Sequence, residues 1–282
     1  MKVLFVFCEG PHDAHFISRI LKTSKQYEEY DKIIKEYPRP LYKFISQTLI
    51  TKNIEEIKIG KPDKHPMPIC SLKKINEEIL VLPISLGGID KIAETKFLLE
   101  KIIISFNKDV LEYPGCEITA ISTLFIYDAD ARGVQETIRL WNERYFHFSF
   151  DLEISQNHSR WIDIKDHRIG IFVFTGPDGN QGTLEDNLIE IFRSNSGTLL
   201  GDAENLLDQY FHGKSENEDE LVYLTKKKKG ILTICGQTEK KNAGYALSVV
   251  VRDTELLNNT FYPINQNTQW AILLNFINNS FL

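Results

Sequence analysis

Short apolar runs alternate with segments of helical periodicity along much of the chain. Residues 2–7 are almost entirely apolar, and helical spacing follows over residues 13–22. The same order of strand, turn and helix recurs in residues 78–106, 121–145 and 167–194. Continuous apolar strands that alternate with helices are typical of a parallel sheet covered on both faces. The pattern predicts an α/β fold with a central, mainly parallel sheet flanked by helices.

Two parts of the chain depart from this pattern. Residues 23–78 are rich in Lys, Tyr and Glu, with a helix-like stretch at 41–50 and a proline-containing loop at 60–70. We expect them to form an inserted, helical part beside the core. Residues 200–282 are helical in pattern and close on an apolar segment, 267–282. The predicted organisation is a core over 1–199, with the insertion 23–78, and a C-terminal helical extension over 200–282 that packs on it.

Composition narrows the function classes. Of 282 residues, 42% are apolar and 26% are charged, and the formal net charge is −6. That balance argues against a general nucleic-acid coat protein, although it permits a local basic channel. The apolar runs are shorter than the ~20 residues that cross a bilayer, and no secretory signal is recognisable. We therefore expect a cytoplasmic protein with no membrane partner. The four cysteines are scattered, so neither a disulfide framework nor a zinc site is indicated.

Acidic residues follow several of the predicted strands. Glu9 follows the first strand, Asp128 and Asp130 follow the third, and Glu185 and Asp186 begin the helix after the fourth. Ligands bind at the carboxyl ends of the strands in a parallel α/β sheet, so these side chains are expected to gather at one edge.

A divalent cation would relieve the repulsion among such carboxylates. Mg²⁺ prefers oxygen ligands, and Mn²⁺ is the second option. If the segment is extended, Asp128 and Asp130 point the same way, because side chains at i and i+2 share a face. Glu9 would either ligate the metal or act as a general acid or base with a raised pKa.

Each element also has a purely structural interpretation. Asp13 lies in a first helical turn, where a carboxylate caps free N–H groups, and Glu185 and Asp186 precede an apolar helix in the same way. An α/β domain whose acidic turns are only caps is therefore one of the hypotheses. His12 and His15 are spaced for zinc on one helix face, but no third ligand has a motif-like spacing. The lysines at 226–229 either contact phosphates or form a solvated loop end.

Taken together, the motifs resemble a TOPRIM domain. Glu9-Gly10 with Asp13 matches the family's first motif, and "YDADARG" supplies Asp128, Asp130 and Gly133. Small TOPRIM relatives of the OLD nucleases also carry an element similar to "GTLEDNL", which contains Gly182, Glu185 and Asp186. The resemblance covers residues 2–22 and 78–194 and implies a Rossmann-like TOPRIM core. No GxxxxGK[ST] motif occurs, so the chain carries no P-loop ATPase module of its own.

The resemblance also assigns roles to residues. It implies that Glu9 is a metal ligand or general acid/base, that Asp128 and Asp130 bind Mg²⁺, and that Glu185 and Asp186 assist a second metal. Many relatives have a basic or hydroxyl residue near position 12, so His12 would supply that phosphate contact here. Nuclease relatives use a late lysine, which predicts a similar contact at the residues Lys240 and Lys241.

The sequence therefore predicts a Mg²⁺-dependent phosphoryl-transfer enzyme of TOPRIM type, a nuclease acting on DNA or RNA. The alternative is a non-catalytic TOPRIM-fold binding or regulatory module that acts with a separate ATPase or defence-system protein. Late lysines that face the acidic cluster would favour catalysis, because a cation opposite the developing charge stabilises a transition state.

Overall fold

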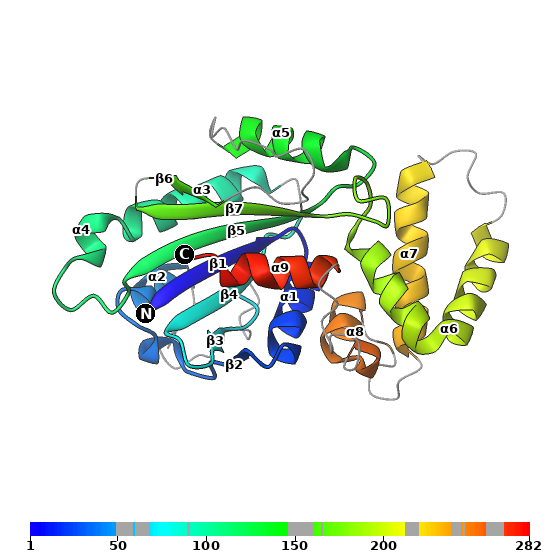
Figure 1. Ribbon diagram of the computed structural model, residues 1–282, viewed down its shortest axis with the longest axis horizontal. Coiled ribbons are helices and arrows are strands. Elements are labelled where there is room, and N and C mark those ends of the chain that lie inside the picture. Colours follow the sequence, from blue (N-terminus) through cyan, green and yellow to red (C-terminus); the bar gives the residue numbers. More distant parts are fainter. Residues whose placement is uncertain are drawn as a thin grey trace.

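A seven-stranded mixed sheet of order β2-β3-β4-β1-β5-β7-β6 forms the centre of the protein (Figure 1). The structure is a computed structural model that describes residues 1–48, 59, 68–88, 91–145, 161–164, 166–211, 220–237, 244, 246–257 and 268–282. The candidate site lies at the carboxyl ends of the parallel strands. The strand ends and the helices that follow the strands position its residues.

The middle of the sheet is parallel, as predicted. β1 (Lys2–Cys8) lies between β4 (Ile79–Ser85) and β5 (Ala120–Asp128), and β5 pairs in parallel with β7 (His167–Phe174). Almost every residue of these strands is buried, which explains why they are continuous apolar runs. Short antiparallel strands complete the edges: β2 (Tyr27–Glu29) and β3 (Leu72–Lys74) beside β4, and β6 (Ile162–Ile164) beside β7.

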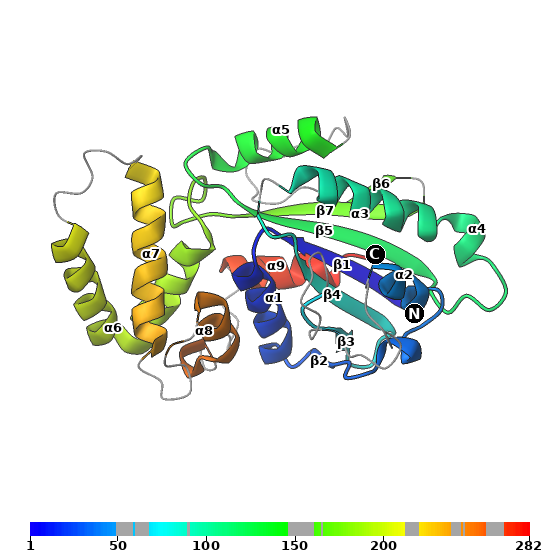
Figure 2. The ribbon, with the colours of Figure 1, turned by 180° about the vertical axis from the view of Figure 1, so that it is seen from behind.

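Helices cover both faces of the sheet (Figures 1 and 2). Alternate side chains of β1 enter two different cores, with Leu4 and Val6 in one and Val3 and Phe5 in the other. The first core is covered by α1 (Pro11–Thr23), the start of α6 (Leu184–Phe211) and α9 (Gln269–Asn278). The second is covered by α2 (Leu41–Thr48), α3 (Ile92–Ser105) and α5 (Gly133–Tyr145). The short helices η1 (Ile34–Glu36) and α4 (Lys108–Leu111) lie in connections.

Three C-terminal elements lie together beyond the carboxyl ends of the parallel strands: α6, α7 (Glu220–Gln237) and α8 (Leu247–Asp253) (Figure 1). α6 contains a kink at Ser196, whose φ of −155° and ψ of 48° are not helical. The expected boundary between residues 199 and 200 falls inside α6, just after this kink. The short η5 (Glu255–Leu257) follows α8, and α9 then returns to the sheet. Trp161 Nε1 donates to the carbonyl oxygen of Phe276 in α9 at 3.1 Å.

The structure refines two expectations. The insertion 23–78 contributes β2 and β3 to the sheet as well as helix α2, because three-residue strands are too short to show an alternating pattern in sequence. The lysines at 226–229 lie within helix α7, so the loop-end interpretation of this run is wrong.

All four cysteines are free thiols. Among the described residues, no helix is long and apolar enough to span a bilayer.

Two helical glycines test how closely the C-terminal helices pack. A Cβ at Gly236 in α7 would lie 2.0 Å from Cγ1 of the buried Val250 in α8, whereas a Cβ at Gly201 in α6 would meet no atom within 4 Å. We expect Gly236→Ala to lower the free energy of unfolding by about 1–3 kcal/mol through overpacking. Gly201→Ala should raise it by about 0.5–1 kcal/mol, since alanine loses less backbone entropy. Urea unfolding measures both, and equal effects of the two variants would contradict the close approach of α7 and α8.

Candidate metal and phosphate site

The ends of β1 and β5 bring Glu9 and Asp128 to the same edge of the sheet. Cys8, the last residue of β1, pairs with Ile126, so Glu9 leaves its strand beside the end of β5. Glu9 and Asp128 are both only partly exposed, and the charge of Glu9 raises the pKa of Asp128. The structure thus brings together these two side chains, as the strand pattern predicts.

Asp128 is tied to the start of α6. Its Oδ1 accepts a hydrogen bond of 2.8 Å from the backbone N–H of Leu184. Burial nevertheless raises the pKa of the Asp128 carboxyl well above its usual range, and the charges of Asp13, Glu185 and Glu9 raise it further. Carboxylates from different parts of the chain therefore make the ionised form of Asp128 less favourable.

Asp130 is placed differently from the prediction. β5 ends at Asp128, and Asp130 has a left-handed φ of 51°, so the two side chains do not share the face of one extended strand. Instead, Asp130 exchanges two backbone hydrogen bonds with Gly182, of 2.8 and 2.9 Å. Its carboxylate pairs with Arg132 at 2.7 Å and is near enough to Glu9 to raise that pKa. Asp130 thus joins the cluster through a turn, which aspartate tolerates better than most residues.

His12 lies between two buried carboxylates. Its Nε2 is 3.3 Å from Oδ1 of Asp13 and 3.2 Å from Oε1 of Glu185. Burial alone would lower the pKa of His12, but these two carboxylates outweigh burial and raise it. Asp13 also caps α1, since its Oδ2 accepts from the N–H of Gly10 at 2.6 Å, so its predicted capping role is confirmed. His12 was predicted to contact phosphate, and in the structure its near neighbours are carboxylates.

Glu9 combines partial burial with like charges. Burial raises the pKa of its carboxyl from 4.5 to about 7, helped by Asp13 and Asp130 and opposed by Lys229 and Arg132. A carboxyl with a pKa near neutrality exchanges protons readily at physiological pH. Glu9 therefore has the electrostatic environment of either a metal ligand or a general acid/base.

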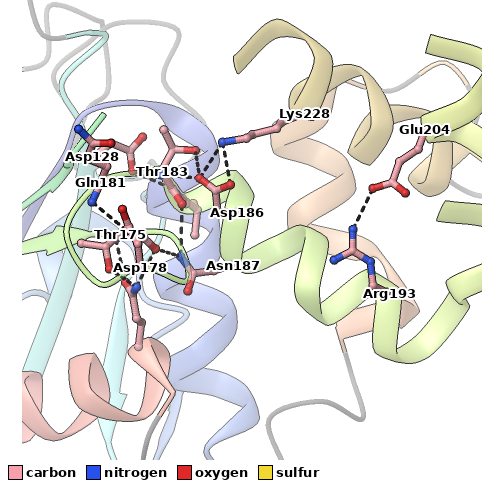
Figure 3. A network of polar contacts seen from close by, with 12 residues as sticks. Asp128, Thr175, Asp178, Gln181, Thr183, Asp186, Asn187, Arg193, Glu204 and Lys228 are labelled. Carbon is pink, nitrogen blue, oxygen red and sulfur yellow. Dashed lines mark hydrogen bonds and ion pairs between the residues drawn. The ribbon is translucent and has the colours of Figure 1, made fainter. Parts of the chain in front are cut away.

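Glu185 and Asp186 are adjacent in sequence but differ in their hydrogen-bond partners. Glu185 is 1% exposed, and neither of its oxygens accepts a hydrogen bond of good geometry from the described residues. Burial alone would raise its pKa, but the contacts with His12 and Lys229 lower it. Asp186 instead caps its own helix, accepting from Thr183 N at 2.9 Å, and pairs with Lys228 of α7 (Figure 3).

Lysines from α7 face the acidic cluster. Lys228 Nζ is 2.7 Å from Oδ1 of Asp186, and Lys229 Nζ is 3.6 Å from Oε1 of Glu185. These are the cations that the sequence indicated through its basic run. Lys240 and Lys241, which the resemblance had favoured, lie outside the described residues.

A glycine-rich loop between β7 and α6 closes one side of the site. The oxygen Oδ1 of Asp178 accepts from the N–H groups of Asn180 and Gln181, and the Gln181 amide donates to the carbonyl of Ala131 at 2.6 Å. A Cβ at Gly182 would lie 2.3 Å from the nitrogen of Gly176, so no larger residue fits there. The loop therefore joins the segment after β5 to the first turn of α6.

The side chains fit Mg²⁺ in their chemistry. They offer carboxylate oxygens, the ligands that Mg²⁺ prefers, and burial together with like charges raises the pKa values of Glu9 and Asp128. Within the part of the chain that the structure describes, no three Asp, Glu, His or Cys side chains form a complete metal cage. Mg²⁺ commonly binds through one or two carboxylates and completes its shell with water and phosphate oxygens, so such a cage is not required. No third ligand joins His12 and His15 for zinc among these residues.

Comparison with known proteins identifies the fold only. No protein-family model matches the chain, and no curated protein matches it. The crystal structure of a hypothetical protein, PH0156 from Pyrococcus horikoshii OT3, is similar with a TM-score of 0.53. The match covers 99% of this chain and 95% of that chain at 16% identity. The two proteins therefore share a fold over nearly their whole lengths.

The sequence alone assigned no role to Arg132, and it gave phosphate contact only as one interpretation of the basic run. Arg132 lies two residues after Asp130 in "DADAR", and that proximity is the signal for their pairing. For Lys228 and Lys229 the only signal was the basic run itself, which carries no information about the carboxylates it meets.

The raised pKa of Glu9 predicts a pH-dependent stability difference. In metal-free protein, Glu9→Gln should be more stable than the wild type near pH 8, and the two should become nearly equal near pH 4. The reason is that ionised Glu9 destabilises the folded state fully above its folded pKa of about 7, and this cost declines as the pH falls from that value towards the ordinary value of 4.5. Urea unfolding with EDTA at both pH values measures the difference. The exposed Glu190→Gln is the control, and a Glu9→Gln effect independent of pH would contradict the assignment.

Proposed function

We propose that this protein is a Mg²⁺-dependent phosphoryl-transfer enzyme of TOPRIM type, a nuclease that cleaves phosphodiester bonds in DNA or RNA. Mn²⁺ is expected to substitute for Mg²⁺. The observation that carries the proposal is a set of carboxylates at the carboxyl edge of the sheet. These carboxylates come from the ends of β1 and β5 and from the start of α6. They raise the pKa values of Glu9 and Asp128, and lysines from α7 face them. Perturbed titratable groups that converge at a strand-end edge are characteristic of functional sites.

The folded state maintains this cluster at a cost. Asp128 and Glu9 are held where burial and neighbouring carboxylates disfavour their charged forms. The buried Glu185 faces its ion-pair partners His12 and Lys229 without a hydrogen bond of good geometry. Buried polar groups normally have hydrogen-bond partners, so this arrangement calls for an explanation. Capping explains Asp13 and Asp186, which accept N–H groups, but it explains neither Glu9 nor Glu185.

The chain's own residues divide into three roles. Glu9, Asp128 and Asp130 would hold the metal, with Glu185 in support. The bound metal would polarise a phosphoryl oxygen and lower the pKa of a coordinated water. Glu9 would also take or return a proton, because its pKa of about 7 suits both at neutral pH.

The third role belongs to the basic side chains. Lys228 and Lys229 approach the cluster from α7, opposite the strand ends that carry the carboxylates. A cation in this position stabilises the charge that develops on a phosphoryl group. This arrangement supports catalysis over the binding-module alternative, because a basic face turned away from the cluster would leave that charge uncompensated.

The second candidate function is a non-catalytic module that binds Mg²⁺ and phosphate beside a separate ATPase or defence-system protein. One observation favours it: the ammonium groups of Lys228 and Lys229 are already paired with Asp186 and Glu185, which leaves less of their charge for a transition state. An assay of the isolated protein separates the two proposals, because the enzyme would turn over substrate alone.

Two conservative substitutions test the enzyme. We expect Glu9→Gln to lower the rate of Mg²⁺-dependent cleavage by on the order of 10²–10⁴-fold, the usual contribution of a positioned acid or base. Asp128→Asn should abolish cleavage by weakening metal binding, while its side-chain oxygen still accepts the N–H of Leu184. Labelled single- and double-stranded DNA and RNA, each with Mg²⁺ and Mn²⁺, serve as substrates.

Glu190→Gln, an exposed change on α6, is the matched control for handling and purity. Cleavage at the wild-type rate by Glu9→Gln would rule out its role in the reaction. If the wild type binds Mn²⁺ but cleaves none of the polymers, the binding-module proposal replaces the enzyme.

A further inference from the structure

Asp186 is saturated with contacts, whereas its neighbour Glu185 is not. The Oδ2 of Asp186 accepts from Thr183 N at 2.9 Å and from Lys228 Nζ at 2.8 Å, and Oδ1 lies 2.7 Å from the same ammonium. Glu185 has looser contacts: its Oε1 lies 3.2 Å from Nε2 of His12 and 3.6 Å from Nζ of Lys229, and neither of its oxygens has a hydrogen bond of good geometry among the described residues. A side chain whose two oxygens are both held by close donors, as in Asp186, is poorly suited to ligate a metal.

The backbone around Asp186 also leaves it little freedom. A Cβ added at Gly182 would lie 2.9 Å from Oδ2 of Asp186, and one at Gly176 would lie 3.6 Å from the same oxygen. Asp186 therefore packs against the glycine-rich loop while it caps α6. Rotation of its carboxylate towards Asp128 would break both the cap and the ion pair.

The packing of α6 against α7 directs Lys228 to this position. The kink at Ser196 changes the direction of α6, and Arg193 before it pairs with Glu204 after it at 2.9 Å (Figure 3). α7 then runs back beside α6, and the two helices approach closely at Gly230, where a Cβ would lie 2.9 Å from Leu207. Lys228 lies two residues before Gly230, on nearly the opposite side of α7, and its side chain contacts Asp186 in the first turn of α6.

We propose that Asp186 is a positioning residue, which holds the ammonium of Lys228 beside the acidic cluster so that Lys228 binds a phosphate of the nucleic-acid substrate. The phosphate part rests on the proposed function. An ammonium has three N–H donors, and its contacts with the two oxygens of Asp186 engage at most two of them, so at least one remains for a phosphate oxygen. The Asp186 and Lys228 side chains are only 16% and 25% exposed, so neither is a freely solvated surface charge.

The chain contains a matched control for this ion pair. Lys227, the preceding residue of α7, pairs with Asp208 on the second half of α6, whose side chain is 58% exposed. Lys227→Met and Asp208→Asn therefore remove an equivalent ion pair between the same two helices, away from Asp186. Methionine keeps the aliphatic stem of lysine, and asparagine at position 186 keeps an oxygen for the N–H of Thr183.

The first measurement uses Mn²⁺ alone. Calorimetric titration should give Asp186→Asn a Mn²⁺ affinity within about twofold of the wild type, whereas loss of a true ligand such as Asp128 should lower it 10-fold or more. A comparable loss in Asp186→Asn would show that Asp186 ligates the metal and would overturn the proposal. Since no nucleic acid is present, this result is independent of the proposed function.

The second measurement uses a labelled DNA duplex and a labelled RNA strand, with Ca²⁺ in place of Mg²⁺ to slow cleavage. Lys228→Met should weaken binding and reduce the slope of log affinity against log salt by about 0.9 for the duplex, or about 0.7 for the single strand, the value for one phosphate contact. Lys227→Met should leave the slope unchanged. Asp186→Asn should weaken binding in the wild-type background and add nothing in the Lys228→Met background.

Additive effects of Asp186→Asn and Lys228→Met, or an equal slope change in Lys227→Met, would overturn the positioning role. If the wild type binds neither polymer, the proposed function and the phosphate contact both fail, and the Mn²⁺ titration still decides whether Asp186 is a ligand.

Discussion

Repulsion among carboxylates at the carboxyl edge of the sheet is the constraint on which the rest of the site depends. Glu9 and Asp13, Asp128, and Glu185 come from three distant parts of the chain, yet each carboxylate is held where burial and its neighbours act on its charge. Folding alone would favour apolar or hydrogen-bonded residues here. The cations Arg132, Lys228 and Lys229, together with the imidazole of His12, are arranged around these carboxylates and offset part of the repulsion.

The fold makes this arrangement possible because the residues that stabilise it are different from the residues that form the site. Two apolar cores on opposite faces of the sheet, together with α9 packed on one of them, fix the strands. The strand ends are then free to carry polar groups, and the loop from Gly176 to Gly182 ties the β5 turn to α6 through close backbone contacts. The α6–α7 pair closes the site from the other side and supplies its lysines (Figure 1).

Part of this could be predicted from sequence, because it follows from local pattern. The strands β1, β4, β5 and β7 are long apolar runs, and parallel strands that end together bring Glu9 near Asp128. The position of Asp130 could not be derived in this way, because it depends on a left-handed residue and a bridge to Gly182. The pairing of Lys228 with Asp186 depends on a kink at Ser196 and on helix packing, and neither has a periodic signal. Strands β2 and β3 are too short to be recognised.

The central claim is that these carboxylates hold a divalent cation, and anomalous scattering from Mn²⁺ soaked into crystals of the protein tests it most directly. The account predicts a peak among the side chains of Glu9, Asp128 and Asp130, close to Glu185, and its loss in crystals of Asp128→Asn. A Mn²⁺ peak elsewhere, with none at this edge of the sheet, would contradict the account and leave the acidic residues as helix caps and partners of the nearby lysines.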